Sequence, residues 1–168
     1  MTTVPPAAEP PGTTWLRTVV SDPLVAPMLR QLGDEYSARY GKDAHAEMAR
    51  YPGAEFEPPD GALLLLMEAG AGVAGGAFRR HDATTAELKR IWTHPAHRRR
   101  GLARRVVAEL EREAAARGYR RVFLTTGPRQ PEARALYLAA GYRPLFDLAA
   151  DPESIGPLPF TKDLAGTG

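Results

Sequence analysis

Residues 86–103 read AELKRIWTHPAHRRRGLA, and this stretch decides the fold prediction because a strand passes here directly into a long helix. The strand is predicted from about Thr85 to Thr93, and the loop His94–His97 that follows contains a proline. Apolar residues then recur at the spacing of an amphipathic helix, namely Leu102, Val106, Leu110 and Ala114. Gly118 closes that helix.

The junction between the strand and the helix has the chemistry of a diphosphate site. A helix begins with unpaired backbone N–H groups and about half a positive charge. Gly101 and Ala103 have no bulky side chain to block an anion, and three arginines, Arg98–Arg100, add positive charge. A diphosphate is the ligand that such a segment favours.

Other phosphate-binding motifs fit less well. The Gly-Lys-Ser/Thr ending of a Walker A loop is absent. Gly70–Gly75 matches the Rossmann pattern, but it joins two predicted strands and opens no helix, so we interpret it as a hairpin turn. The pattern Arg/Gln-x-x-Gly-x-Gly/Ala at a strand-to-helix junction fits Arg98, Gly101 and Ala103.

The remaining elements predict one α/β domain over residues 14–168, with a mixed, mostly antiparallel sheet flanked by helices. Residues 1–13 are expected to form a flexible Pro-rich tail. Helices are predicted from an N-cap at Ser21 to Gly41, over 44–50 and over 132–140. Further strands are predicted over 15–20, 62–68, 73–80, 121–126, 142–148 and 159–164, with a turn-rich segment at 51–61.

Composition narrows the function classes. Hydrophobic residues make up 43% and charged residues 25%, as in a soluble globular protein. A net charge of +2 does not indicate a dedicated nucleic-acid binder, and the absence of cysteine excludes a cysteine nucleophile. Ala62–Met67, the longest aliphatic run, is too short to span a bilayer. From the net charge we expect no nucleic-acid partner, and from the short aliphatic run no membrane partner. No secretory signal pattern precedes the domain, so we expect a cytoplasmic protein.

Residues 14–164 resemble the GNAT superfamily of N-acetyltransferases. The resemblance is densest in Ala86–Pro95 and Arg98–Ala103, and it continues in Thr125–Gly127, Gln130–Tyr137 and Gly141–Pro144. It implies acetyl transfer from acetyl-CoA to a primary amine. Ala103 stands where the family more often has glycine, and Phe146–Leu164 matches the family poorly.

The resemblance also implies roles for individual residues. The backbone of Ile91, Trp92 and Thr93 would hydrogen-bond pantetheine like an added strand. The N–H groups of Arg99–Arg104 would hold the pyrophosphate, and Tyr137 would face the sulfur. The predicted cofactor-binding residues are Ile91, Trp92, Thr93, Arg98, Arg99, Arg100, Gly101, Leu102, Ala103, Arg104, Thr126, Gln130, Ala133 and Tyr137.

Two residues are predicted to be catalytic. Glu87 is the candidate base that removes the proton of the acceptor ammonium, and Tyr137 is the candidate donor to the leaving thiolate. Alternatively, Glu87 forms an ion pair with Lys89 or Arg90, and Tyr137 only packs. Direct attack in a ternary complex is expected, since no cysteine is present to carry the acyl group.

Several alternatives concern the ligands. The arginine run could be a solubilising face or an RNA-binding patch, and the loop with Glu55, Phe56, Glu57 and Asp60 could attract a cationic acceptor or simply be solvated. His94 and His97 lack a third ligand, so no metal is expected. We expect a small-molecule amine acceptor and a monomer or homodimer. A protein or peptide N-acetyltransferase, a non-catalytic acyl-CoA-binding regulatory module and a nucleic-acid-binding protein are the alternative functions.

Overall fold

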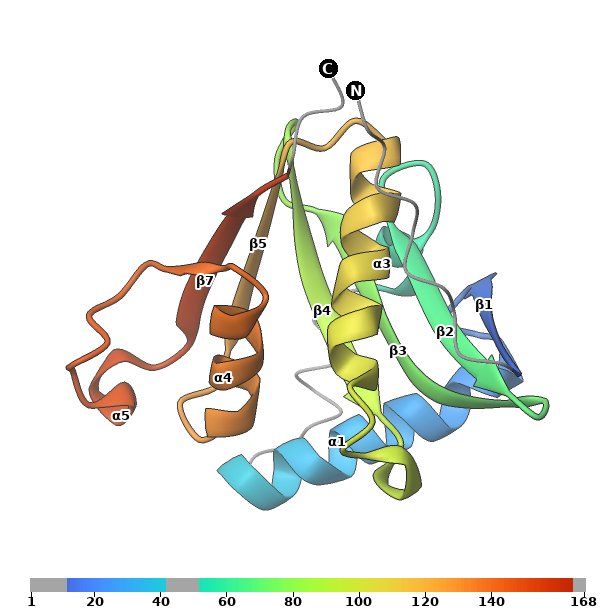
Figure 1. The fold of residues 1–168 in the computed structure, drawn as a ribbon, viewed down its shortest axis with the longest axis horizontal. Coiled ribbons are helices and arrows are strands. Elements are labelled where there is room, and N and C mark those ends of the chain that lie inside the picture. The colour runs from blue at the N-terminus through green and yellow to red at the C-terminus, as the bar shows by residue number, and fades with distance from the viewer. Residues whose placement is uncertain (1–11, 42–51, 165–168) are drawn as a thin grey trace.

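The computed structural model describes residues 12–41 and 52–164, which form one seven-stranded sheet with helices on both faces (Figure 1). The strand order is β1-β2-β3-β4-β5-β7-β6; β4 and β5 are parallel, and the other neighbours are antiparallel. The strands are β1 (Thr13–Thr18), β2 (Ala62–Glu68), β3 (Ala71–Arg80), β4 (Thr85–Thr93), β5 (Arg121–Thr126), β6 (Arg143–Pro144) and β7 (Leu158–Asp163). The α-helices are α1 (Ala26–Tyr40), α3 (Leu102–Ala116), α4 (Pro131–Ala139) and α5 (Pro152–Ile155), and the 3₁₀ helices are η1 (Pro23–Val25), η2 (Gly53–Phe56) and η3 (Pro95–His97). The predicted mixed α/β fold is therefore confirmed.

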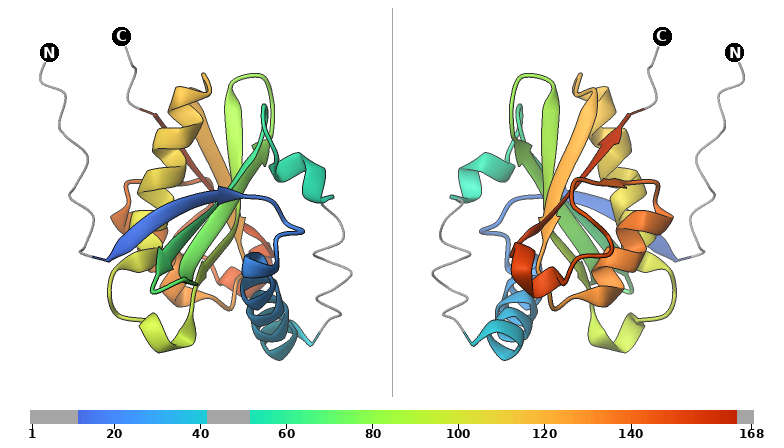
Figure 2. Two further views of the ribbon diagram at one scale, coloured as in Figure 1. Left: turned by 90° about the vertical axis from the view of Figure 1, so that its right-hand side faces the viewer. Right: turned by 90° about the vertical axis from the view of Figure 1, so that its left-hand side faces the viewer.

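Two cores lie on opposite faces of the sheet. Leu64 and Leu66 of β2 point into the core shared with α3 and α4, whereas Leu63 and Leu65 point into the core shared with α1. Figure 2 shows α1 and α3 on the two sides of the sheet. β2 is thus buried on both faces, as its continuous apolar sequence predicts.

The structure corrects some element boundaries. β1 begins at Thr13, inside the predicted tail, and Asp22 rather than Ser21 caps the first helical turn. The Asp22 carboxylate accepts hydrogen bonds from Leu24 N–H at 2.9 Å and from the Thr18 hydroxyl, and Pro23 follows it at the first helical position. The helix predicted over 44–50 and most of the tail lie outside the described residues.

The C-terminal part differs more. The strand predicted over 142–148 is wrong beyond Pro144, because proline has no N–H for the ladder and the chain then bends away. Helix α5 was not predicted. Among residues 12–41 and 52–164, no helix is long and apolar enough to cross a membrane.

The strand β4 has a feature that positions the site. Lys89 pairs with Ala77 of β3 and Trp92 pairs with Gly75, so Arg90 and Ile91 together oppose the single residue Gly76. Arg90 has a left-handed φ of 59°. Such a β-bulge bends its strand and increases the local twist. Accordingly, β4 pairs with β5 only from Thr85 to Glu87, and no further β4–β5 ladder forms among the described residues.

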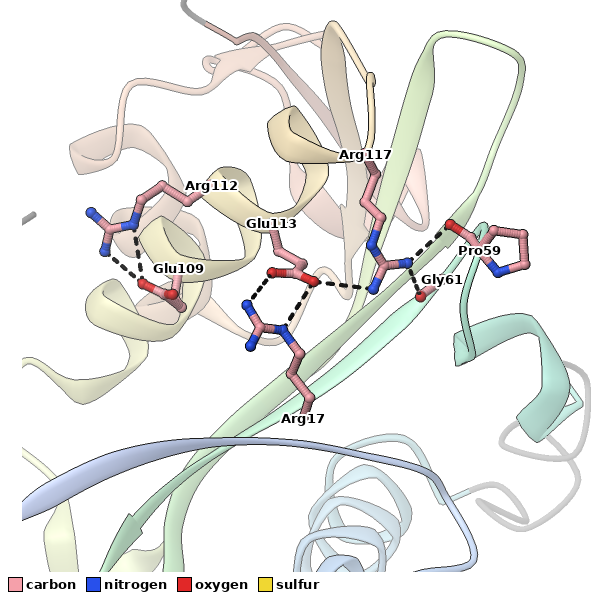
Figure 3. A network of polar contacts seen from close by, with 7 residues as sticks. All are labelled: Arg17, Pro59, Gly61, Glu109, Arg112, Glu113 and Arg117. Carbon is pink, nitrogen blue, oxygen red and sulfur yellow. Dashed lines mark hydrogen bonds and ion pairs between the residues drawn. The ribbon is translucent and has the colours of Figure 1, made fainter. Parts of the chain in front are cut away.

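Ion pairs hold the edge of the sheet to α3 (Figure 3). Arg17 of β1 donates two hydrogen bonds to Glu113 of α3, at 3.1 and 2.9 Å. Arg117 donates to the same carboxylate at 3.1 Å and to the carbonyls of Pro59 and Gly61 at 2.9 and 2.8 Å. Glu113 therefore joins β1, α3 and the segment before β2, and only 11% of its side chain is exposed.

We expect Glu113→Gln to lower the free energy of unfolding at neutral pH by about 1.5–3 kcal/mol, because charge-assisted hydrogen bonds are lost. The hydrogen bond from Arg17 and the charges of Arg17 and Arg117 lower the pKa of Glu113. The contribution of Glu113 to the free energy of unfolding is therefore complete above the pKa of glutamate in the unfolded chain, about 4.3. It is lost as the pH falls through the lower pKa that Glu113 has in the folded protein. In urea unfolding experiments, the free energies of unfolding of Glu113→Gln and the wild type should become equal at acidic pH.

Glu109→Gln is the matched control. Glu109 pairs with Arg112 on the same helix, at 2.6 Å and with half of the arginine side chain exposed (Figure 3). Removal of this pair should lower the free energy of unfolding by at most about 0.5 kcal/mol. Equal losses for the two variants, or a Glu113→Gln loss independent of pH, would contradict the assigned role.

Candidate active site

A cavity of about 650 Å³ opens where β4 and β5 separate. Its walls come from α1, β4, the start of α3, the end of β5 and α4. The lining residues are Leu32, Glu35, Tyr36, Arg39, Leu88, Lys89, Arg90, Ile91, Trp92, Thr93, Arg98, Ala103, Thr125, Thr126, Gly127, Gln130, Glu132, Ala133, Leu136, Tyr137 and Pro157. Nine of the predicted cofactor residues are in this set: Ile91, Trp92, Thr93, Arg98, Ala103, Thr126, Gln130, Ala133 and Tyr137.

The diverging strands give the cavity two backbone edges. Leu88–Thr93 of β4 and Thr125–Gly127 at the end of β5 face it, and beyond Glu87 the two strands no longer pair with each other. Free strand edges bind an extended chain by main-chain hydrogen bonds. The side chain of Trp92 turns away into the core beside α1, where its indole N–H donates to Gln31 at 2.8 Å, so only its backbone is available here.

The helix α3 begins beside this cavity. Gly101 precedes it with a left-handed φ of 71°, and no side chain caps the first turn. A Cβ added at Gly101 would meet no atom within 4 Å, so the space in front of the helix is open. The first N–H groups of the helix can therefore receive an anion, with the favourable end of the helix dipole behind them. The geometry fits the predicted diphosphate.

The arginines around this turn are more constrained than the sequence suggests. Arg100 is one of the three arginines expected to add positive charge here, but its guanidinium binds Glu68 at 2.8 Å and lies 2.7 Å from His97 Nδ1. Arg104 donates to the Ala139 carbonyl at 3.3 Å, and Arg98 lies 3.9 Å from Glu35. Of these three side chains, only that of Arg98 lines the cavity.

Tyr137 on α4 lines the cavity with a largely buried side chain. It is 6% exposed, and its ring lies 5.7 Å from Tyr142 and 5.9 Å from Phe160. Burial raises the pKa of the Tyr137 hydroxyl above its usual range, so the hydroxyl stays protonated at neutral pH. The packing of Tyr137 is therefore present, while its role as a donor to the thiolate stays a prediction.

The turn before α4 is fixed by a side-chain amide. Gln130 Oε1 accepts from the Gly127 N–H at 3.0 Å and lies 3.5 Å from the Thr126 hydroxyl. A Cβ on Gly127 would collide with the Tyr40 hydroxyl, so a larger residue here would displace the Tyr40 side chain. The Gln130 oxygen is thus used to shape the wall of the cavity.

Helix α1 supplies a wall that the sequence did not predict. Leu32, Glu35, Tyr36 and Arg39 share one face of the helix, and their helical spacing was the only signal in the sequence. Arg39 also bridges to the far side of the cavity, where it contacts Glu132 of α4 and donates to the Arg129 carbonyl at 2.6 Å.

Glu87 does not line the cavity. Its carboxylate, 5% exposed, accepts a hydrogen bond from Arg79 at 2.8 Å and lies 3.3 Å from Lys89 Nζ. The ion pair with Lys89 that was the alternative interpretation is therefore present, while the catalytic role stays a prediction. Lys89 itself lines the cavity and links Glu87 to it. Glu55 binds Arg79 at 3.0 Å with 36% of its side chain exposed, and Phe56 is fully buried, so both residues have structural contacts.

Comparison with known proteins agrees with this geometry. The model of the acetyltransferase (GNAT) family matches residues 26–142. The N-acetyltransferase YsnE of Bacillus subtilis, itself uncharacterized, is 36% identical over 85 residues, which cover 48% of this chain and 56% of that relative. The match thus spans little more than half the length of YsnE.

Solved structures share the fold. A Klebsiella pneumoniae protein assigned as an acyl-CoA N-acyltransferase superposes with a TM-score of 0.71 at 22% identity, covering 91% of this chain and 98% of its own. A GNAT family acetyltransferase from Elizabethkingia anophelis, solved with acetyl-CoA bound, gives a TM-score of 0.66 at 13% identity over 92% and 100% of the two chains.

Proposed function

The chain belongs to the acetyltransferase (GNAT) family, and from this premise we propose that it transfers an acetyl group from acetyl-CoA to a primary amine by direct attack in a ternary complex. The observation that carries the proposal is the separation of β4 from β5 directly beside the uncapped start of α3. An extended arm with a diphosphate at one end fits that combination. The acetyl-CoA found in the Elizabethkingia anophelis structure supports the same ligand.

Two parts of the site would bind two chemically different portions of acetyl-CoA. The N–H groups from Arg99 to Arg104 would hold the diphosphate, and the backbone of Ile91–Thr93 would hold the pantetheine arm. Acetyl-CoA supplies an acetyl thioester, whose carbonyl carbon the amine attacks and whose thiolate leaves. A backbone N–H on the free edge of β4 can donate to the carbonyl oxygen as negative charge develops there.

Two side chains would handle protons. Tyr137 would donate a hydrogen bond to the leaving sulfur, and its raised pKa keeps that donor protonated. A thiolate of pKa about 8.5 needs only modest help of this kind. The acceptor must lose a proton, and Glu87 would receive it by way of water, because its carboxylate lies just outside the cavity wall.

A bridge between two walls of the cavity favours a small acceptor. Arg39 bridges α1 and α4 across the cavity, through Glu132 and the Arg129 carbonyl. A peptide would need an open groove, so a small-molecule amine is preferred over a protein acceptor. A cytoplasmic location, a monomer or homodimer, and a flexible tail ahead of β1 stay predictions from the sequence.

We expect acetyl-CoA at 100 times its dissociation constant to stabilise the protein by about 2.7 kcal/mol, a melting shift of about 5–10 °C. Gly101→Glu should abolish this shift, because a carboxylate would occupy the diphosphate position. Gly118→Glu is the matched control, since Gly118 also has a positive φ, 93°, and open space, but lies at the other end of α3. An intact shift in Gly101→Glu, or its loss in both variants, would contradict the site.

We expect Glu87→Gln to slow transfer to alkylamines by about 10²–10⁴-fold while acetyl-CoA binding is kept, because alkylamines are protonated at neutral pH. Transfer to hydroxylamine, which is largely uncharged at that pH, should be far less affected. Thiol release measured with both acceptors distinguishes the roles. An equal loss for both acceptors would assign Glu87 to structure, through its ion pair with Arg79.

A further inference from the structure

A partly buried polar cluster lies at the end of α4, and none of its side chains lines the cavity. The Tyr142 hydroxyl donates to Glu111 of α3 at 2.8 Å, and Tyr142 is 3% exposed. Lys162 of β7 donates to the other oxygen of Glu111 at 2.9 Å and to the Ala140 carbonyl at 2.8 Å. The cluster thus connects α3, β7 and the carboxyl end of α4.

This cluster touches Tyr137 directly. The Tyr142 N–H donates to the Tyr137 carbonyl at 3.0 Å, and the two rings meet at 68° with centroids 5.7 Å apart. Phe160 contacts the Tyr137 ring at 5.9 Å. The ring of Tyr137 is therefore held by Tyr142 and Phe160 while its side chain lines the cavity.

Helix α3 holds the end of α4 at a second point. Arg104 donates to the Ala139 carbonyl at 3.3 Å. Arg104 and Glu111 are seven residues apart, so they lie two turns apart on the same face of α3. The helix whose first turn faces the diphosphate site thus also fixes the short helix that bears Tyr137.

Packing alone would not require this polar cluster. Apolar side chains of similar volume are as stabilising as a buried ion pair, or more so, because the pair must be desolvated. The Glu111 side chain is 15% exposed and that of Lys162 is 29% exposed, so both have lost much of their hydration. The cluster fixes the direction of the Tyr142 side chain, because hydrogen bonds constrain its ring and apolar contacts would not.

We propose that Tyr142, held by Glu111 and Lys162, is a positioning residue that aims the Tyr137 hydroxyl at the reacting sulfur. The inference rests on the proposed acetyl transfer. Displacement of a reacting group by a fraction of an ångström is enough to slow a reaction, because the hydroxyl then meets the sulfur at a poor distance and angle.

A double-mutant cycle tests this role. Tyr137→Phe, Tyr142→Phe and the double variant are compared in single-turnover thiol release from acetyl-CoA with hydroxylamine as acceptor. Tyr142→Phe should lower the rate about threefold to tenfold, as expected for one misdirected hydrogen bond, with little change in KM for acetyl-CoA. In the Tyr137→Phe background the same change should have no effect beyond about twofold, because no hydroxyl remains to be positioned.

Tyr119→Phe is the matched control. The buried Tyr119 hydroxyl donates to the Asp60 carbonyl at 2.6 Å, near the far end of α3. Its loss should lower the melting temperature about as much as Tyr142→Phe and leave the rate unchanged. Glu111→Gln, which keeps an acceptor for the Tyr142 hydroxyl, should lose less rate than Glu111→Leu.

Each of the following results would overturn either the positioning role of Tyr142 or the proposed function. If Tyr142→Phe slows both backgrounds equally, or leaves the rate unchanged, Tyr142 is a packing residue and the inference is overturned. If Tyr137→Phe itself keeps the full single-turnover rate, its donor role fails, and the positioning role fails with it. An absence of acetyl-CoA turnover in the wild type with hydroxylamine and with every amine tried would instead overturn the proposed function.

Discussion

The bulge in β4 is the constraint on which the site depends. Two residues of β4, Arg90 and Ile91, oppose the single residue Gly76 of β3, so β4 turns away from β5 after only three paired residues. A left-handed φ at a non-glycine residue costs about 1–2 kcal/mol. The Arg90 guanidinium lies 4.6 Å from the centre of the Phe56 ring, and this contact helps to offset the cost.

Glycines opposite the bulge let both helical layers approach the sheet. A Cβ on Gly76 would lie 2.7 Å from Ile91 and 2.9 Å from Leu110 of α3. On the other face, a Cβ on Gly75 would lie 3.3 Å from the Met28 sulfur of α1. A larger residue at Gly76 would push against α3, which forms a wall of the cavity, and one at Gly75 would collide with Leu64 and Leu65 of β2.

The sequence predicted the parts of the site that are local in the chain. The junction at Arg98–Ala103 follows from a short pattern and Tyr137 from the resemblance to the GNAT superfamily, and Arg98, Ala103 and Tyr137 line one cavity. Long-range partners could not be predicted in this way. Arg100 pairs with Glu68, 32 positions away, and Arg39 contacts Glu132, 93 positions away. Such contacts depend on how the sheet folds, and no periodicity within one helix or strand records them.

We infer that the β4 edge that faces the cavity receives an extended arm. Amide hydrogen exchange measures it directly, by comparing acetyl-CoA with adenosine 3′,5′-bisphosphate, which has phosphates but no pantetheine. Both ligands should slow exchange at the start of α3, whereas only acetyl-CoA should slow it in Leu88–Thr93 and Thr125–Gly127. If saturating acetyl-CoA protects the start of α3 but leaves exchange in β4 unchanged, the strands do not hold the pantetheine arm and the proposed binding mode is wrong.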